Sequence, residues 1–334
     1  MPSSITVTEP LVRAACVLGE GPLWDLYTST LHFVDIQSRQ ARTFFMTLDL
    51  SVTFTQVLHY NTLTRQLTRD QYAEAVTCLL AGATSCGIAL LNNGSLSYLS
   101  KPLPTNEASH TRFNDGACDR RGRLIVGTVQ SADGRVQGKL YSYDPSTKQC
   151  KVLDTGFTVS GVMLSRFRAP ILSTPHEQDG NGLGWSADDR ILYFTDSLVN
   201  RIYAYDYKID TGVVSNRRTF IDACALGYPR TTYCDGLCID SEGCIWSARW
   251  ANSKITRHKR DGSVDFEVLF PHVYTVTSCC FGGPNLDQLF VTTAHCGANN
   301  GPSEKQARFP YSGDLFVVNL AGRFKGLARF EFGL

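Results

Sequence analysis

The sequence contains no run of 18 uninterrupted apolar residues, which is the minimum expected of a membrane-spanning helix. Its first ten residues have neither a basic segment nor an apolar core, so the pattern of a secretory signal is missing. An excess of positive charge is also missing: 32 Lys and Arg against 31 Asp and Glu give a formal net charge of +1. That balance provides no basic surface for nucleic acid or an anionic membrane. We expect a cytoplasmic monomer or weak homo-oligomer with no nucleic-acid and no membrane partner.

Several catalytic motifs are absent as well. Gly184-Trp-Ser-Ala-Asp188 fails the last position of a nucleophile elbow, and no glycine-rich phosphate loop is present. The seven histidines show no i, i+2 or i, i+4 pairing, which disfavours a histidine-rich metal site. The 12 cysteines lack C-x2-C pairs, and Cys234, Cys238 and Cys244 form the densest group. We interpret these three as reduced strand thiols in preference to zinc ligands.

One hairpin pattern is written three times. An Asn or Asp beside a glycine leads into an apolar run, a polar turn follows, and a second apolar run completes the pattern. The copies are Asn114-Asp-Gly-Ala-Cys-Asp-Arg-Arg-Gly-Arg-Leu-Ile-Val-Gly-Thr128, Asn181-Gly-Leu-Gly-Trp-Ser-Ala-Asp-Asp-Arg-Ile-Leu-Tyr-Phe-Thr-Asp196 and Asp235-Gly-Leu-Cys-Ile-Asp-Ser-Glu-Gly-Cys-Ile-Trp246. A repeated hairpin with one variable polar residue at a fixed place predicts one site shared by several repeats.

The remaining sequence reads as short strands separated by turns. Val12–Leu18 is one strand-like run, and only Thr62–Ala75 has partly helical character. The glycines of the three hairpins recur at intervals of 66 and 54 residues, from Gly116 to Gly182 to Gly236. Both intervals fall near the length of a four-stranded propeller blade if about 20 residues before Asn181 are an insertion. We therefore predict an all-β, six-bladed β-propeller with a central metal channel, forming a single domain over residues 1–334.

In a propeller, the ends of the innermost strands converge on the central channel. Glu20, which lies between two glycines, would then join Asn114, Asn181 and Asp235 at one channel mouth. Two carboxylates and an amide oxygen are hard donors that suit one divalent ion, namely Ca²⁺, Mg²⁺ or Mn²⁺, with Zn²⁺ also accepted. Such an ion would polarise a carbonyl or phosphoryl oxygen and orient water. An interaction scaffold whose channel groups bind only water is the alternative.

These motifs resemble the family of senescence marker protein 30 (regucalcin), gluconolactonase and luciferin-regenerating enzyme. The segments that carry the resemblance are Gly19-Glu-Gly-Pro-Leu-Trp-Asp25, Arg112-Phe-Asn-Asp-Gly116, Asn181-Gly-Leu-Gly-Trp-Ser186, Tyr193-Phe-Thr-Asp-Ser197, Asp235-Gly-Leu-Cys-Ile-Asp-Ser-Glu-Gly243 and Thr277-Ser-Cys-Cys-Phe-Gly-Gly283. The resemblance implies a six-bladed propeller with one divalent ion and sugar-lactone hydrolysis. It implies Glu20, Asn181 and Asp235 as metal ligands, Asp235 as catalytic acid/base, and Arg112 and Asn114 as residues that bind the sugar.

Two features depart from the family pattern. Gln130-Ser-Ala132 stands where mammalian-type members have a substrate-contacting Glu, which leaves the sugar specificity open. In the family pattern, the strand that ends near Ser160 would continue directly into Asn181, but here residues 161–180 stand between them as an insertion. A second insertion is expected near 42–57. Each is either a surface loop or a translated intron. The leading hypothesis is hydrolysis of an aldonolactone. A metal-dependent esterase or organophosphate hydrolase, and a non-catalytic calcium-binding regulatory propeller, are the alternatives.

Overall fold

The computed structural model describes residues 2–45, 52–56, 60–65, 80–92, 95–131, 133–157 and 180–333. Strands make up almost all the regular structure in these ranges, and they form six sheets. The only helices among the described residues are two short 3-10 turns, Ala298–Asn300 and Ser303–Ala307. No helix in the described part of the chain is long and apolar enough to cross a membrane.

Each sheet is one blade, and its strands follow one another in chain order from the centre outward, with β1 as the exception. Blade one holds β2 (Gly19–Asp25), β3 (Thr30–Asp35), β4 (Gln40–Phe45) and β5 (Val52–Gln56). Blade two holds β6 (Tyr60–Arg65), β7 (Leu80–Thr84), β8 (Ile88–Asn92) and β9 (Ser95–Ser100). Blade three holds β10 (Phe113–Cys118), β11 (Leu124–Thr128), β12 (Gly138–Asp144) and β13 (Gln149–Phe157).

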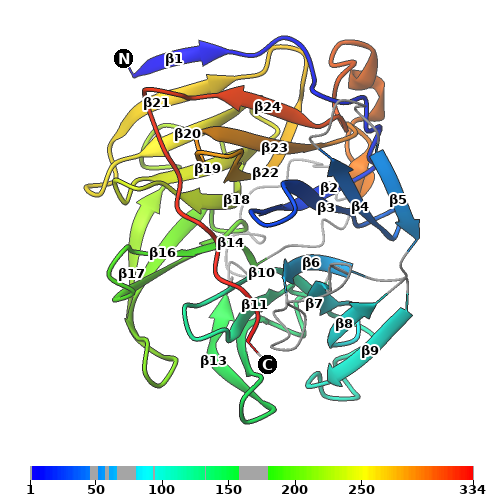
Figure 1. Cartoon of the computed structure of the whole chain (residues 1–334), viewed down its shortest axis with the longest axis vertical. Helices are drawn as coiled ribbons and strands as arrows, with labels where there is room; N and C mark the ends of the chain where they lie inside the picture. Colours follow the sequence, from blue (N-terminus) through cyan, green and yellow to red (C-terminus); the bar gives the residue numbers. More distant parts are fainter. Residues whose placement is uncertain are drawn as a thin grey trace, which may run out of the picture.

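Blade four holds β14 (Gly180–Trp185), β15 (Ile191–Asp196), β16 (Arg201–Lys208) and β17 (Val213–Asp222). Blade five holds β18 (Tyr233–Ile239), β19 (Ile245–Trp250), β20 (Lys254–His258), β21 (Val264–Leu269) and, at its outer edge, β1 (Ser3–Thr6). Blade six holds β22 (Thr275–Gly282), β23 (Gln288–Ala294) and β24 (Phe316–Asn319). The first strand of each blade contacts the first strand of the next, and β22 contacts β2, so the six blades close into a ring (Figure 1).

The core lies between neighbouring blades. Trp246 and Phe266 of blade five pack together, and Trp246 meets Phe281 of blade six edge to face, with 5.6 Å between ring centroids. Similar clusters join the other blades, because each blade presents apolar side chains on both of its faces. Burial of these two-sided sheets is the main force that holds the ring together.

The repeated polar turn has a direct structural role. In Asp119 of blade three and Asp240 of blade five, one carboxylate oxygen accepts hydrogen bonds from the backbone N–H groups two and four residues later, at 2.9–3.0 Å. The glycine three residues after each aspartate, Gly122 or Gly243, has a φ of 77°, which a side chain would strain. The Asp-x-x-Gly sequence thus fixes the hairpin between the first and second strands of the blade.

The two chain ends fasten the ring. Strand β1 pairs in parallel with β21, and Leu11 and Val12 hydrogen-bond to Leu315, the residue before β24. Residues 321–333, here called the C-terminal strap, cross one face of the propeller over its centre (Figure 1). The strap hydrogen-bonds to Ser241 and Leu286 near its start and to Gly122 at its end.

The predicted six-bladed, all-β propeller is confirmed. One local prediction was wrong: Val12–Leu18 is not a strand but part of the connection from β1 of blade five to β2 of blade one, and it forms only isolated bridges. In the segment 62–75, which was expected to be partly helical, residues 62–65 belong to strand β6, and residues 66–75 lie outside the described residues. Residues 40–45 and 52–56, inside or beside the predicted insertion at 42–57, form β4 and β5. The segment 161–179 lies outside the described residues, so that insertion stays a prediction, as does the single domain over 1–334.

Candidate metal and active site

The four polar residues predicted at the channel mouth all lie near the beginning of innermost strands. Glu20 is the second residue of β2, Asn114 the second of β10, Asn181 the second of β14, and Asp235 the third of β18. All four are buried, with exposed fractions of 8%, 5%, 5% and 3%. Since these strands surround one channel, the four side chains belong to the same end of it.

Asn114 and Asn181 are directly linked across the boundary between blades three and four. The Asn114 side-chain nitrogen donates to Oδ1 of Asn181 at 2.8 Å and to the backbone oxygen of Gly180 at 3.2 Å. Arg112 completes the chain, because its guanidinium donates to Oδ1 of Asn114 at 2.7 Å. The structure therefore brings together the two residues expected to bind the sugar and one of the expected metal ligands.

Ser197 fixes the other side of the Asn181 amide. The Asn181 side-chain nitrogen donates to the Ser197 hydroxyl at 2.8 Å, and this hydroxyl donates to the carbonyl of Cys234 at 2.7 Å. Ser197 was not predicted as a functional residue, although it ends the quoted segment Tyr193–Ser197. Its position one residue after β15, beside the start of β14, could have been inferred from antiparallel pairing.

Close backbone contacts fix the relative positions of the inner strands at this level. A Cβ atom on Gly182 would lie 2.3 Å from the backbone nitrogen of Leu237, and one on Gly236 would lie 2.1 Å from the Ser278 hydroxyl. Thr277 then donates to the backbone oxygen of Gly19 at 2.5 Å. The chain of contacts thus runs from blade four through blades five and six to the residue before Glu20.

The residues present fit a divalent cation. Glu20 and Asp235 supply carboxylate oxygens and Asn181 an amide oxygen, which are the donors that hard cations prefer. Both carboxylates are almost completely removed from solvent, where a negative charge is costly unless a positive charge compensates it. Two such carboxylates would neutralise one divalent ion. The amide of Asn181 is already oriented through Asn114 and Ser197, as a metal ligand requires.

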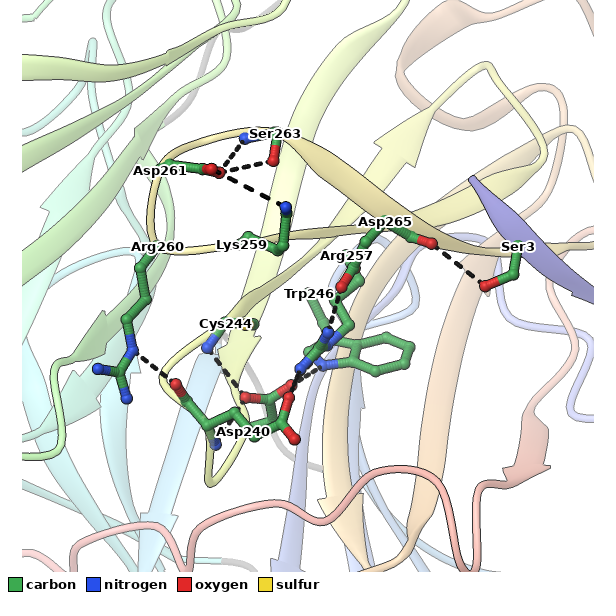
Figure 2. A network of polar contacts seen from close by, with 11 residues as sticks. Ser3, Asp240, Cys244, Trp246, Arg257, Lys259, Arg260, Asp261, Ser263 and Asp265 are labelled. Carbon is green, nitrogen blue, oxygen red and sulfur yellow. Dashed lines mark hydrogen bonds and ion pairs between the residues drawn. The ribbon is translucent and has the colours of Figure 1, made fainter. Parts of the chain in front are cut away.

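A second acidic group has a different role. Asp240, Glu242 and Cys244 bring their ligand atoms within 4.8 Å of one another. Figure 2 shows that the Arg257 guanidinium occupies this group, with ion pairs to Asp240 at 2.7 Å, to Glu242, and to Asp265 at 2.6 Å. The positive charge of Arg257 takes the place that a cation would need, so this cluster is structural.

The two cysteines of β18, Cys234 and Cys238, contact different partners. Cys238 lies with its sulfur 3.5 Å from that of Cys279 in blade six, while Cys234 accepts a hydrogen bond from Arg249. Burial raises the pKa of the Cys234 and Cys238 thiols, which favours the neutral form over a metal-binding thiolate.

Sequence comparison identifies the family. The family model described as "SMP-30/Gluconolactonase/LRE-like region" matches residues 18–166 and 177–295. The chain belongs to the SMP-30/gluconolactonase/LRE-like family. The family match includes all the candidate residues: Glu20, Arg112, Asn114, Asn181 and Asp235. It omits residues 167–176, which lie within the predicted insertion at 161–180.

Relatives in this family match along their whole length. Regucalcin of Danio rerio is 29% identical over 341 residues, which cover 99% of each protein. The solved structure of a luciferin-regenerating enzyme superposes with a TM-score of 0.78 at 26% identity, over 98% of this chain and 99% of the other. A calcium-binding regucalcin from Agrobacterium tumefaciens gives a TM-score of 0.80 at 21% identity over both full chains, which supports the SMP-30/gluconolactonase/LRE-like fold.

Proposed function

We propose that this protein hydrolyses a sugar lactone to the aldonic acid with one divalent metal ion held by Glu20, Asn181 and Asp235. The observation that carries the proposal is the linked arrangement at the channel mouth, in which Arg112, Asn114 and Asn181 are joined by hydrogen bonds of 2.7 and 2.8 Å. Membership of the SMP-30/gluconolactonase/LRE-like family supports the same chemistry.

The reaction requires attack of water on the lactone carbonyl carbon and cleavage of the bond between that carbon and the ring oxygen. A divalent ion, when bound, would supply Lewis-acid polarisation of the carbonyl group. Asp235 would accept the proton of the attacking water and deliver a proton to the departing ring oxygen, which becomes a hydroxyl. Its 3% exposure suits this role, because bulk water does not compete for the proton.

Substrate binding would fall to Arg112 and Asn114. The Arg112 guanidinium is half-buried and has one of its nitrogens engaged with Asn114 and the carbonyl of Phe113. A guanidinium carries five N–H donors, and sugar hydroxyls accept hydrogen bonds readily. The link to Asn114 would hold these donors in a fixed direction, so binding would cost less conformational entropy.

The direct experiment is a hydrolysis assay on glucono-δ-lactone and several pentonolactones, followed by the fall in pH. The protein is first treated with a chelator, and Ca²⁺, Mg²⁺, Mn²⁺ and Zn²⁺ are then restored separately. Activity that disappears with chelation and returns with an ion supports the proposal. Metal binding without lactone hydrolysis for any ion would refute it.

Asp235→Asn separates enzyme from binding protein. The amide keeps an oxygen donor but cannot carry the proton, so lactone hydrolysis should fall by about 10²–10⁴-fold. A calcium-binding regulatory propeller is the alternative favoured by the regucalcin relatives. It would show calcium affinity and no turnover to lose. Parallel assays with an aryl ester and an organophosphate test whether the same site prefers those substrates.

A further inference from the structure

A cavity lies between the C-terminal strap and the end of the channel opposite Glu20 and Asp235. Its volume is about 90 Å³, several times the roughly 10–15 Å³ that a single water needs on the same measure. Its apolar wall comes from five inner strands, β2, β10, β14, β18 and β22, and from the strap, and includes Leu23, Leu183, Ile239, Phe281 and Leu327.

The cavity is separate from the candidate metal site. Its wall residues follow the candidate site residues by two to four positions on the same strands: Leu23 follows Glu20, and Ile239 follows Asp235. A strand advances about 3.3 Å per residue, so the two sites are separated by roughly 7–13 Å along the channel. The separation allows each site to hold its own small molecule.

One polar group of the cavity wall has no internal partner. Trp185 is 7% exposed, lines the cavity and packs edge to face against Tyr207. Its indole nitrogen is buried and has no hydrogen-bond partner among the described residues. A buried N–H without an acceptor costs free energy, and a ligand that brings an acceptor would remove that cost.

A positive charge lies in the same wall. Arg329 of the strap lines the cavity and is half-buried, and its guanidinium donates to the backbone oxygen of Cys279 at 3.3 Å. Within the described part of the chain, no carboxylate lies within ion-pairing distance of Arg329. The cavity wall also contains Asp189, but the guanidinium of Arg120 already neutralises that carboxylate.

From this combination the structure assigns a second ligand site, for a small apolar monocarboxylate of aromatic or medium-chain type. The carboxylate would accept hydrogen bonds from Arg329 and from the indole N–H of Trp185, and the apolar body would lie against Leu23, Ile239 and Phe281. Leu327 is 40% exposed at the cavity wall, where the strap meets solvent. The inference stands independently of the proposed lactonase activity.

Calorimetric titration of the full chain with benzoate and hexanoate tests the proposal, with benzamide and hexanol as uncharged analogues. We expect submillimolar binding of the two carboxylates and clearly weaker binding of the uncharged pair. Chelation of metal should leave the carboxylate affinity unchanged. Equal affinity for benzoate and benzamide, absence of carboxylate binding, or competition by glucono-δ-lactone would each overturn the assignment.

Two variants locate the binding. Arg329→Gln should weaken benzoate binding about tenfold or more, since a charge-assisted hydrogen bond is lost, while benzamide binding should change little. Trp185→Phe should weaken both ligands and remove the tryptophan fluorescence change caused by binding. Arg323→Gln is the matched control, because Arg323 lies on the same strap outside the cavity wall. Thermal unfolding confirms that each variant is folded, and equal effects of the two arginine variants would refute the site.

Discussion

The side-chain nitrogen of Asn114 donates a hydrogen bond of 2.8 Å to Oδ1 of Asn181, the oxygen proposed to bind the metal. On its other side, the Asn181 nitrogen donates to Ser197. The amide therefore cannot rotate to present its nitrogen to the channel without losing two hydrogen bonds. A residue expected to bind the sugar thus also determines which atom of a metal ligand faces the metal.

Removal of either anchor should weaken metal binding. Asn114→Ala and Ser197→Ala each release one side of the Asn181 amide, and we expect the affinity for Ca²⁺ or Mn²⁺ to fall about tenfold in each variant, as is usual for groups that orient a ligand. Calorimetric titration with the metal alone measures this without reference to activity. Asn319→Ala, an exposed asparagine on β24, is the control. Unchanged affinity in both anchor variants would contradict the proposed role of Asn181.

The glycines of β14 should differ sharply in their tolerance of alanine. A Cβ on Gly182 would lie 2.3 Å from the Leu237 backbone nitrogen, whereas one on Gly184 would meet the end of the Ile239 side chain at 2.9 Å. Backbone cannot move aside as a flexible side chain can. We expect Gly182→Ala to lower the free energy of unfolding by about 3 kcal/mol and Gly184→Ala by about 1 kcal/mol or less. Urea unfolding of both variants checks this, and equal losses would contradict it.

The Arg257 network should be important for stability. Asp240→Ala removes the acceptor of the Trp246 indole, at 2.9 Å, and of two backbone N–H groups, and it leaves Arg257 buried with only the more exposed Glu242 and Asp265. Breaking a buried ion pair on one side costs about 3–5 kcal/mol, which we expect here. Chemical unfolding measures it. Arg218→Ala, which removes an exposed ion pair to Asp206, should leave the midpoint unchanged.

His258 should make the fold sensitive to mild acid. Burial lowers the pKa of His258 from 6.5 to about 4, and the nearby charge of Arg249 acts in the same direction. In the unfolded chain His258 therefore becomes protonated below about pH 6.5, whereas in the folded chain it stays neutral down to about pH 4. Stability should fall by about 3 kcal/mol across that interval as pH decreases. Chemical unfolding at several pH values from 7 to 4 measures this. The free energy of unfolding of His258→Gln should change less with pH than that of the unsubstituted protein, and an equal change would contradict the prediction.

The blade architecture and the inner-strand positions were predictable from local patterns. The Asp-x-x-Gly turn leaves a clear signal because its aspartate and glycine serve the same hairpin each time. The structure has four predicted residues near the beginnings of innermost strands: Glu20, Asn114, Asn181 and Asp235. The local signal for them was a polar residue beside a glycine at the start of an apolar run. Their roles in metal and sugar binding were inferred from chemistry and resemblance, and stay proposals.

Other features depend on contacts that no local pattern encodes. Ser197 reaches Asn181 through strand pairing and Cys234 through the neighbouring blade, so its role needs both partners in view. The strap lacks regular structure and is held by a few backbone hydrogen bonds and by isolated side chains, such as Phe332 stacked on Tyr143. Thr62–Arg65 has polar, helix-compatible residues, yet pairing with β7 makes it a strand, because tertiary contacts override weak propensity.

The contacts that close the ring also affect the order in which the strands fold. Ser3 hydrogen-bonds to a residue 262 positions later, and Ala15 to one 299 positions later. Such distant contacts slow folding, because most of the chain must be ordered before they form. During synthesis, β1 emerges from the ribosome first and must wait for β21, so it is among the last strands to find its partner. Until β21 has formed, the unpaired edge of β1 is open to other chains, which exposes the partly folded protein to aggregation.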